Sequence, residues 1–255
     1  LANLHNAKKA NSGLVNVVGE HALEHIKLDA PLTADIEGIA KPVSHWIKTC
    51  KSSLNVGENA AEAVKESLNP PGKIATLILP GDTAWNEGKI AKPLKNYKRH
   101  IIEEEKIKIT AEALKKAKNP MILIGGKALE EKNLILASKI ASRYNCSIMT
   151  DFFNAKLERG AGRIKPTRIP YNVDRAVKLL KDFDTIILIG AREPVAFFAY
   201  PNKPSVLTSE NTKFIDFAKV EEDITQGLEN LCEYVNGKDK ITSNIAEISL
   251  PTIQK

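Results

Sequence analysis

Aromatic side chains are scarce in this sequence, where phenylalanine, tryptophan and tyrosine make up 5% of the 255 residues. Proteins that bind nucleic acids usually interleave aromatic side chains with concentrated basic ones. Here the lysines are scattered and often neighbour glutamates, as in residues 103–106, and the formal net charge is only +6. We therefore expect a solvated, lysine-rich surface and no nucleic-acid partner.

Cysteine is also rare, and its three positions, Cys50, Cys146 and Cys232, lie far apart without a C-x-x-C spacing. An odd number of widely spaced cysteines predicts neither a disulfide framework nor a zinc site. Cys146 stands in an apolar run, which favours a core position over a nucleophilic one. This cysteine usage is typical of the reducing cytoplasm, where we expect the protein to reside.

Long apolar runs are missing, since none approaches the ~18 residues that a membrane-spanning helix requires. Residues 1–5 are neither basic nor followed by a long apolar core, so they do not resemble a signal peptide. The sequence also lacks an initiator methionine. We expect no membrane partner, and we expect the chain to begin within a longer protein.

Several catalytic signatures are absent, because no P-loop, G-x-S-x-G or H-E-x-x-H pattern occurs. His21 and His25 have the i, i+4 spacing that can hold a metal ion on a helix. No third ligand is evident beside them, so we predict no metal site.

The sequence does contain a repeated alternation of short apolar runs with helical patterns, which predicts an α/β fold with doubly wound parallel sheets. The expected strands are 14–18, 43–49, 74–79, 121–124, 146–149, 185–189, 205–207 and 214–217. The expected helices are 2–10, a short one from Thr33, 57–68, 111–117, 129–144, 174–180 and 221–235. On helix 57–68 the predicted apolar stripe is Ala60, Ala61, Val64 and Leu68.

A change of composition divides the chain into two domains. Residues 86–109 are rich in Lys, Glu and Asn and have little apolar periodicity, which predicts an inter-domain linker. Residues 1–85 then form a first domain that is incomplete at its amino terminus, and residues 110–236 form the second. Residues 237–255 are a polar tail. An apolar content of 43% is ample for buried cores.

Glu20 and His21 follow the first expected strand. In open parallel sheets, ligands bind in the crevice just beyond the carboxyl ends of the strands. An imidazole with an unperturbed pKa of ~6.5 suits proton transfer at neutral pH. These two residues are therefore catalytic candidates, with solvated or capping roles as the alternative. Farther along, Asp35 and Glu37 are expected in the first turn of a helix, where acids favour the helix dipole.

Two buried strands of the second domain end in glycine, at Gly125-Gly126 and at Gly190. Glycine lets backbone N–H groups approach a phosphate that a side chain would exclude, and Arg192 could pair with such a phosphate. Neither stretch is a G-x-G-x-x-G. A nucleotide site and a tight turn under a helix both remain open here.

Several segments resemble the thiamine-diphosphate-dependent enzymes of the acetolactate synthase and benzoylformate decarboxylase type. In the first domain, residues 1–7 resemble the run after the family's Gly-Pro-Gly turn, and residues 14–19 resemble the strand and turn that follow it. Residues 29–46 resemble a loop that leads to Pro-Val, and residues 71–80 resemble the closing strand of the domain. In the second domain, 119–126 and 187–192 resemble paired strand ends of the family's central domain. Residues 194–200 resemble a subgroup of acetolactate synthase-like large subunits.

The resemblance implies a fragment of a 2-keto-acid carboligase or decarboxylase. Residues 1–85 would be the carboxyl-terminal part of a pyrimidine-binding domain and 110–236 a central Rossmann-like domain. The tail, 237–255, would lead to a pyrophosphate-binding domain that is missing. The implied cofactors are thiamine diphosphate and Mg²⁺, with FAD in the central domain as an option that is not required. The parent protein would be a homodimer or a homotetramer that acts on a small-molecule 2-keto acid.

The resemblance also assigns roles to residues. His21 would act as acid or base on the 2-keto acid, Glu20 stands near a position where the family usually has Gln, and Asn3 would lie on the cofactor side of the crevice. Some family members bind FAD in the central domain, and Gly125, Gly126, Gly190 and Arg192 are compatible with such a nucleotide without requiring one. The family's activating glutamate and its Gly-Asp-Gly…Asn motif do not occur in this sequence, so we expect the chain to be inactive alone.

Two alternatives come from other classes. One is a non-catalytic nucleotide-binding or regulatory module built on the second domain. The other is an NAD-dependent deacetylase-like protein, which would need a catalytic histidine in the second domain. No histidine follows His100, and we set that alternative aside.

Overall fold

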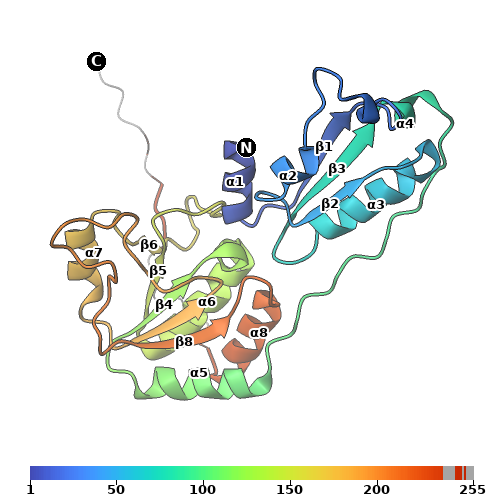
Figure 1. Ribbon diagram of the computed structural model, residues 1–255. Coiled ribbons are helices and arrows are strands. Elements are labelled where there is room, and N and C mark those ends of the chain that lie inside the picture. The colour runs from blue at the N-terminus through green and yellow to red at the C-terminus, as the bar shows by residue number, and fades with distance from the viewer. Residues whose placement is uncertain (238–244, 249, 251–255) are drawn as a thin grey trace. The chain divides into compact units, whose positions relative to one another are not determined.

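Two parallel sheets organise the chain, which divides into the units Leu1–Arg99 and His100–Lys255 (Figure 1). The computed structural model describes residues 1–237, 245–248 and 250. The first sheet has three strands and the second has five, and all the strand pairs are parallel. The predicted α/β class with two parallel-sheet domains is confirmed.

The first sheet has the order β1-β3-β2, with the strands Leu14–Glu20, Ile74–Pro80 and Trp46–Thr49 respectively. The central strand β3 is apolar and nearly all buried, as expected for a parallel strand that is flanked by neighbours and covered on its faces. The edge strand β1 is only half-buried, and Val17 in it is 60% exposed. The buried position of β3 explains why this strand is recognisable in the sequence as a continuous apolar run.

The helices of the first unit are α1 to α4, with the bounds Ala2–Lys9, Ile36–Ala40, Val56–Ser67 and Asp82–Trp85. Short 3₁₀ turns at Ile26–Leu28 and Ser53–Asn55 precede α2 and α3. The stripe predicted on α3 is wrong in part, because Val64 and Leu68 are exposed. The face that packs on β3 is centred on Ala63, whose small side chain allows close approach and turns the larger residues outward.

Tertiary contacts shift three predicted boundaries in this unit. β1 continues through Glu20, because it pairs residue by residue with β3 as far as Pro80. β2 begins only at Trp46, because Val43 and Ser44 form a turn in which both backbone N–H groups donate to Ala40. α2 does not begin at Thr33. Its N-cap is Asp35, whose carboxylate accepts a 2.8 Å hydrogen bond from the backbone N–H of Gly38.

The second sheet has the order β6-β5-β4-β7-β8. In chain order from β4 to β8 the strands span Pro120–Ile124, Ser147–Thr150, Thr167–Arg168, Thr185–Ile189 and Lys213–Ala218. Numbered along the chain, this order is 3-2-1-4-5, so it reverses direction between the adjacent strands β4 and β7. Such a reversal is the topological switch point at which ligands bind in open α/β sheets.

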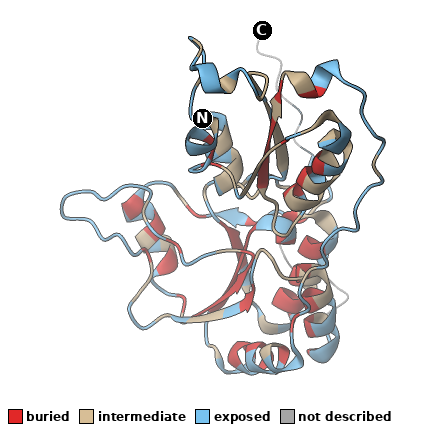
Figure 2. Cartoon of the chain, turned by 45° about the vertical axis from the view of Figure 1, so that its right-hand side comes forward, coloured by how far each residue is buried: buried red, intermediate tan, exposed pale blue. Residues whose placement is uncertain are grey.

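Helices cover both faces of the second sheet, and their bounds are Glu104–Lys116 for α5, Glu131–Tyr144 for α6, Val173–Leu180 for α7 and Ile224–Tyr234 for α8. A 3₁₀ turn at Gly126–Leu129 precedes α6. Ile122 and Ile124 face one buried cluster with α5, α6 and α8, and Met121 and Leu123 face another with α7. Figure 2 shows the buried residues gathered on these strands and on the inner sides of the helices.

Two other expectations differ from the structure. The strand expected at 205–207 is only an isolated bridge between Val195 and Val206. α5 begins at Glu104, within the segment expected to be the linker, and Ile102 just before it is buried. In the tail, 238–244, 249 and 251–255 lie outside the described residues, and Ile245 bridges Ile164.

The tryptophans and one cysteine illustrate how the two cores differ. Both tryptophans belong to the first unit, where Trp46 packs on its small core and Trp85 is 75% exposed. Cys146 packs against the larger core of the second unit, and burial raises the pKa of its thiol to about 12. A thiol held in its protonated form is a poor nucleophile.

Within the part of the chain that the structure describes, no helix combines the length and the apolar character that crossing a membrane requires.

Candidate functional site

The carboxyl ends of β1 and β3 lie side by side in the first unit and carry the predicted catalytic pair. Glu20 is the last residue of β1 and lies opposite Pro80, the last residue of β3. The backbone N–H of Gly81 donates a 3.0 Å hydrogen bond to the carbonyl of Glu20, so the two exits from the sheet are joined. In open parallel sheets, ligands bind beyond the carboxyl ends of the strands, so this edge is the candidate site of the first unit.

Asp82 fixes the loop that follows β1. Its carboxylate accepts a 3.1 Å hydrogen bond from the backbone N–H of Leu23, and it stands in the first turn of α4. In the same loop, the rings of His21 and His25 lie 5.3 Å apart between centroids, at an angle of 57°. The sequence analysis missed Asp82. The available signal was a polar residue just after a buried strand that neighbours β1.

His21 is the residue of this group with unused hydrogen-bonding capacity. Its Nε2 atom is buried and has no hydrogen-bond partner among the described residues. A buried polar atom without a partner costs about 1–3 kcal/mol, so such an atom is rarely left unpaired in a functional protein. The orphaned nitrogen fits a group that would accept or donate a proton at this edge of the sheet.

The structure gives Glu20 a local role that the sequence did not predict. Its Oε1 atom accepts a 2.6 Å hydrogen bond from the backbone N–H of His21. The carboxylate therefore helps to orient the start of the loop in which His21 stands. A direct catalytic role for Glu20 stays a prediction.

The other first-unit candidate, Asn3, is not brought to this cluster by any described contact. It is exposed in the first turn of α1, a helix without buried residues, and its side chain makes no hydrogen bond to the described residues. Across the described ranges, no group of three or more His, Cys, Asp or Glu side chains could hold a metal ion. Among the described residues, the cofactor-binding role of Asn3 stays a prediction, and no cluster of these side chain types is assembled for a metal ion.

In the second unit, Gly125 and Gly190 meet at the switch point between β4 and β7. A Cβ atom on Gly125 would lie 2.5 Å from the carbonyl oxygen of Gly190, and one on Gly190 would lie 2.6 Å from that of Gly125. Gly190 also has a φ of +61°, which favours glycine. Only residues without a side chain fit where these two backbones cross.

The N–H groups of the two glycines are already engaged. Gly125 donates to the carbonyl of Ile189 at 2.9 Å, and Gly190 donates to that of Ala218 at 2.7 Å. The tight-turn alternative thus accounts for both glycines without a phosphate. Gly126 (φ +51°) and the exposed Arg192 lie just beyond them, and their nucleotide-binding role stays a prediction.

Six aromatic rings, unexpected in an aromatic-poor sequence, gather on loops of the second unit. Each ring lies within 6.4 Å of another between centroids, mostly edge to face. Five of them are exposed by 41% or more. The six are Phe152, Phe153, Tyr171, Phe197, Phe198 and Tyr200. Because three separate loops contribute them, the sequence showed only the 194–200 part.

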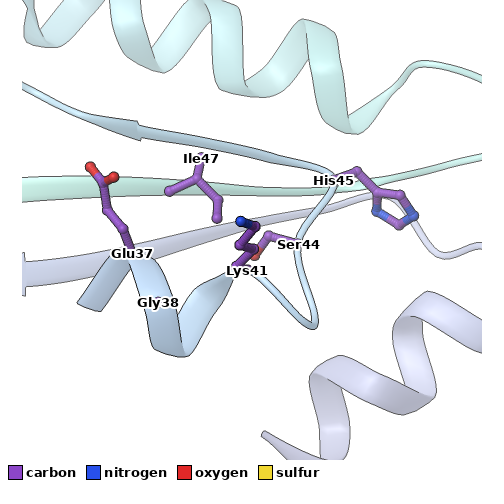
Figure 3. Close-up of a pocket in the computed structure, with 6 residues that line it drawn as sticks. All are labelled: Glu37, Gly38, Lys41, Ser44, His45 and Ile47. Atoms are coloured by element: carbon purple, nitrogen blue, oxygen red, sulfur yellow. The ribbon is translucent and has the colours of Figure 1, made fainter. Parts of the chain in front are cut away.

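A hollow of about 470 Å³ lies in the first unit between α2 and β2, lined by Glu37, Gly38, Lys41, Ser44, His45 and Ile47 (Figure 3). His45 precedes β2, and its Nδ1 atom accepts a 3.0 Å hydrogen bond from the backbone N–H of Ile74. Burial, followed by the positive charges of Lys8 and Lys73, lowers the pKa of His45 below its usual value.

This environment predicts a pH effect on stability. Because the folded-state pKa of His45 is the lower one, the unfolded chain takes up the proton first as the pH falls through ~6.5. We expect stability to be lost below that pH, down to the folded-state pKa, and the H45Q variant to lose less. Urea unfolding at a series of pH values measures this, and NMR titration of His45 in folded and urea-unfolded chains gives the two pKa values. Equal titration midpoints in the two states would contradict it.

Comparison with known proteins indicates the family to which the chain is related. The chain is 38% identical over 207 residues to IlvX of Mycobacterium tuberculosis (strain ATCC 25618 / H37Rv), a protein provisionally named an acetolactate synthase large subunit. The match covers 81% of this chain and 40% of that protein. The resemblance to the thiamine-diphosphate-dependent enzymes is confirmed. The chain thus spans less than half the length of the curated relative from this family.

Solved structures of thiamine-diphosphate-dependent enzymes share the fold of this chain. One is a protein from Mycobacterium smegmatis, provisionally named a thiamin diphosphate-dependent enzyme, with a TM-score of 0.73 over 97% of this chain and 50% of that one, at 17% identity. Another is a thiamine diphosphate-dependent 4-hydroxybenzoylformate decarboxylase from Rhodococcus jostii RHA1, with a TM-score of 0.72 over 99% and 51%, also at 17% identity.

A sequence model of a second family, CO dehydrogenase beta subunit/acetyl-CoA synthase epsilon subunit, matches residues 91–192. These residues run from the irregular segment before α5 into the end of β7 and the turn after it. This match covers less than half of the chain, and the thiamine-diphosphate family is the one supported over most of it.

Proposed function

We propose that this chain is part of a thiamine-diphosphate-dependent carboligase or decarboxylase of 2-keto acids, similar to acetolactate synthase, and that it does not turn over by itself. The observation that carries the proposal is the buried Nε2 atom of His21, which lacks a partner at the carboxyl edge of the first sheet. The similarity to IlvX and the shared fold support it.

When bound, thiamine diphosphate would supply the electron sink that allows a 2-keto acid to lose CO₂. The residues of this chain would position the reacting groups. His21 would hold or move a proton at Nε2, the atom that has no partner among the described residues. Glu20 would orient the start of the loop through the N–H of His21, and Asp82 would anchor the loop through Leu23.

The substrate class follows from the relatives. The 4-hydroxybenzoylformate decarboxylase acts on a 2-keto acid, and we infer a small 2-keto acid for the protein to which this chain belongs. We infer Mg²⁺ as the companion of the diphosphate, held by residues outside those described here. We also propose that the protein to which this chain belongs is a homodimer or homotetramer and that it resides in the cytoplasm.

Calorimetric titration of the chain with thiamine diphosphate and Mg²⁺ tests the claim that it is incomplete. We expect no saturable binding, because the described residues supply no cage for the metal and diphosphate. Tight binding would contradict the claim.

Where the gene encodes further domains, the H21Q variant of the whole enzyme should lose about 10²–10⁴-fold in kcat. H5Q is the matched control, because His5 is exposed on α1, and an equal loss in both variants would remove His21 from the mechanism.

A second candidate, a non-catalytic nucleotide-binding module, is favoured by one observation. Gly125 and Gly190 mark the switch point of the second sheet, where nucleotides bind in open α/β folds. The flanking gene distinguishes the two candidates. An upstream glutamate with a downstream Gly-Asp-Gly…Asn supports the enzyme, and a natural chain that ends at Lys255 supports the module.

A further inference from the structure

The six aromatic rings on the loops of the second unit have no part in the proposed function, and we call them the aromatic face. The face consists of Phe152, Phe153, Tyr171, Phe197, Phe198 and Tyr200. Its three loops follow β5, β6 and β7, which run parallel, so the loops leave the second sheet at its carboxyl edge. We propose that two copies of this chain associate through the aromatic face. The proposal rests on the homodimer or homotetramer inferred above and names the surface that forms it.

The rings form one continuous patch. Phe152 has three other rings around it, at distances between 5.1 and 6.0 Å from centroid to centroid. Phe197 extends the patch to Phe198 at 4.6 Å, and Tyr200 follows at 6.4 Å from Phe198. Most of these pairs meet edge to face, which is a favourable arrangement for aromatic rings. The rings therefore hold one another in place, and the face exists before a partner binds.

A large part of the aromatic face is exposed to water. Phe152 is half-buried, and the other five side chains are 41% to 66% exposed. Because an aromatic side chain presents about 200 Å², these five leave roughly 500 Å² uncovered. Two copies that meet through the face would remove about 1,000 Å² from water, which is the lower limit for a specific protein–protein interface. The rings alone thus supply the area that a weak dimer needs, before the surrounding loop residues are counted.

The charges beside the rings do not favour a polyanionic partner. Five charged residues lie within three positions of a ring along the chain, and they are Asp151, Lys156, Arg168, Asp174 and Lys203. Lys156 forms an ion pair with Glu158 at 2.9 Å, and Lys203 forms one with Asp174. The remaining two residues, Asp151 and Arg168, have opposite signs. Nucleic acids and anionic membranes bind concentrated basic side chains, and this rim does not concentrate them.

A second copy of the chain satisfies the conditions of area and charge together. In a two-fold contact the same surface occurs on both sides, so the rings of one copy meet the rings of the other. A rim that carries both signs is compatible with its own copy, whereas a rim of one sign would repel it. Aromatic side chains are also enriched at the buried centres of interfaces between proteins. The aromatic face has this composition, with apolar rings at its centre and charges of both signs beside them.

Analytical ultracentrifugation of the chain over a series of concentrations tests the proposal. We expect a reversible equilibrium between monomer and dimer. The Y200S and F198S variants should each weaken the association by about tenfold or more, because a few aromatic anchors supply most of the binding energy of an interface. Y234S is the matched control, since Tyr234 is a tyrosine of the second unit that is 50% exposed, against 41% for Tyr200, and lies outside the face. Circular dichroism of each variant confirms that it is folded.

Two sedimentation results would overturn the proposal: a chain that stays monomeric at every concentration, and equal association of Y200S and Y234S. A third result comes from vesicles that contain phosphatidylglycerol. If the chain and Y234S sediment with them and Y200S does not, the face binds lipid and the assignment to a second copy is overturned. Association is measured without catalysis, so its absence leaves the proposed reaction standing. Conversely, a whole enzyme that does not turn over leaves a measured interface unchanged.

Discussion

Replacing Gly125 by alanine is expected to destabilise the second unit by about 3 kcal/mol, the upper range for overpacking a buried site. The added Cβ atom would lie 2.5 Å from the carbonyl oxygen of Gly190. Neither backbone can yield easily, because Gly125 donates to Ile189 and Gly190 donates to Ala218 within the sheet. The loss would thus come from separating two central strands at the switch point.

A matched control for this substitution exists in the other sheet. Gly19 lies near the end of β1, as Gly125 lies just beyond the end of β4, but a Cβ atom built on Gly19 meets nothing within 4 Å. Its replacement by alanine should change stability little, since alanine restricts the unfolded chain without straining the folded one. Urea unfolding followed by circular dichroism measures both variants. Equal stability of the Gly125 and Gly19 variants would show that the close approach of the two backbones is not limiting.

Replacing Ile102 by alanine is expected to cost about 2–5 kcal/mol, as for other fully buried aliphatic side chains. Ile102 is 2% exposed and fills a notch in α8 that exists because residue 227 is glycine. A Cβ atom on Gly227 would lie 2.1 Å from the Cδ1 atom of Ile102. The backbone N–H of Ile102 also donates a 2.9 Å hydrogen bond to Gln226.

The neighbouring residue provides the control for Ile102. Ile101 has the same side chain and is 70% exposed. Its replacement by alanine should change the free energy of unfolding by no more than about 0.5 kcal/mol. The same unfolding experiment compares the two variants. A similar loss in both would mean that Ile102 is not an anchor of the second unit.

Parallel strands were the most predictable part of the fold. β3, β4 and β7 are continuous apolar runs because both of their faces are covered, and that pattern is visible in the sequence. Boundaries set by long-range contacts were not visible. The end of β1 at Glu20 depends on its pairing with β3, and the burial of Ile102 depends on Gly227.

The candidate site was predictable only in outline. The rule for carboxyl ends located Glu20 and His21, because one strand and its exit suffice to apply it. Asp82 could not be assigned in the same way, since its hydrogen bond to Leu23 joins residues that are distant in the chain. The six aromatic rings come from three loops, and no local pattern indicates that such loops converge.

The placement of both tryptophans in the first unit has a spectroscopic consequence. Trp46 packs on the small core beside Ala63, and Trp85 is the last residue of α4. With excitation near the red edge of protein absorption, emission therefore comes from Leu1–Arg99 alone. The second unit, with its tyrosines and phenylalanines, contributes to circular dichroism without contributing to that signal. The first unit thus carries an optical label of its own in the unmodified chain.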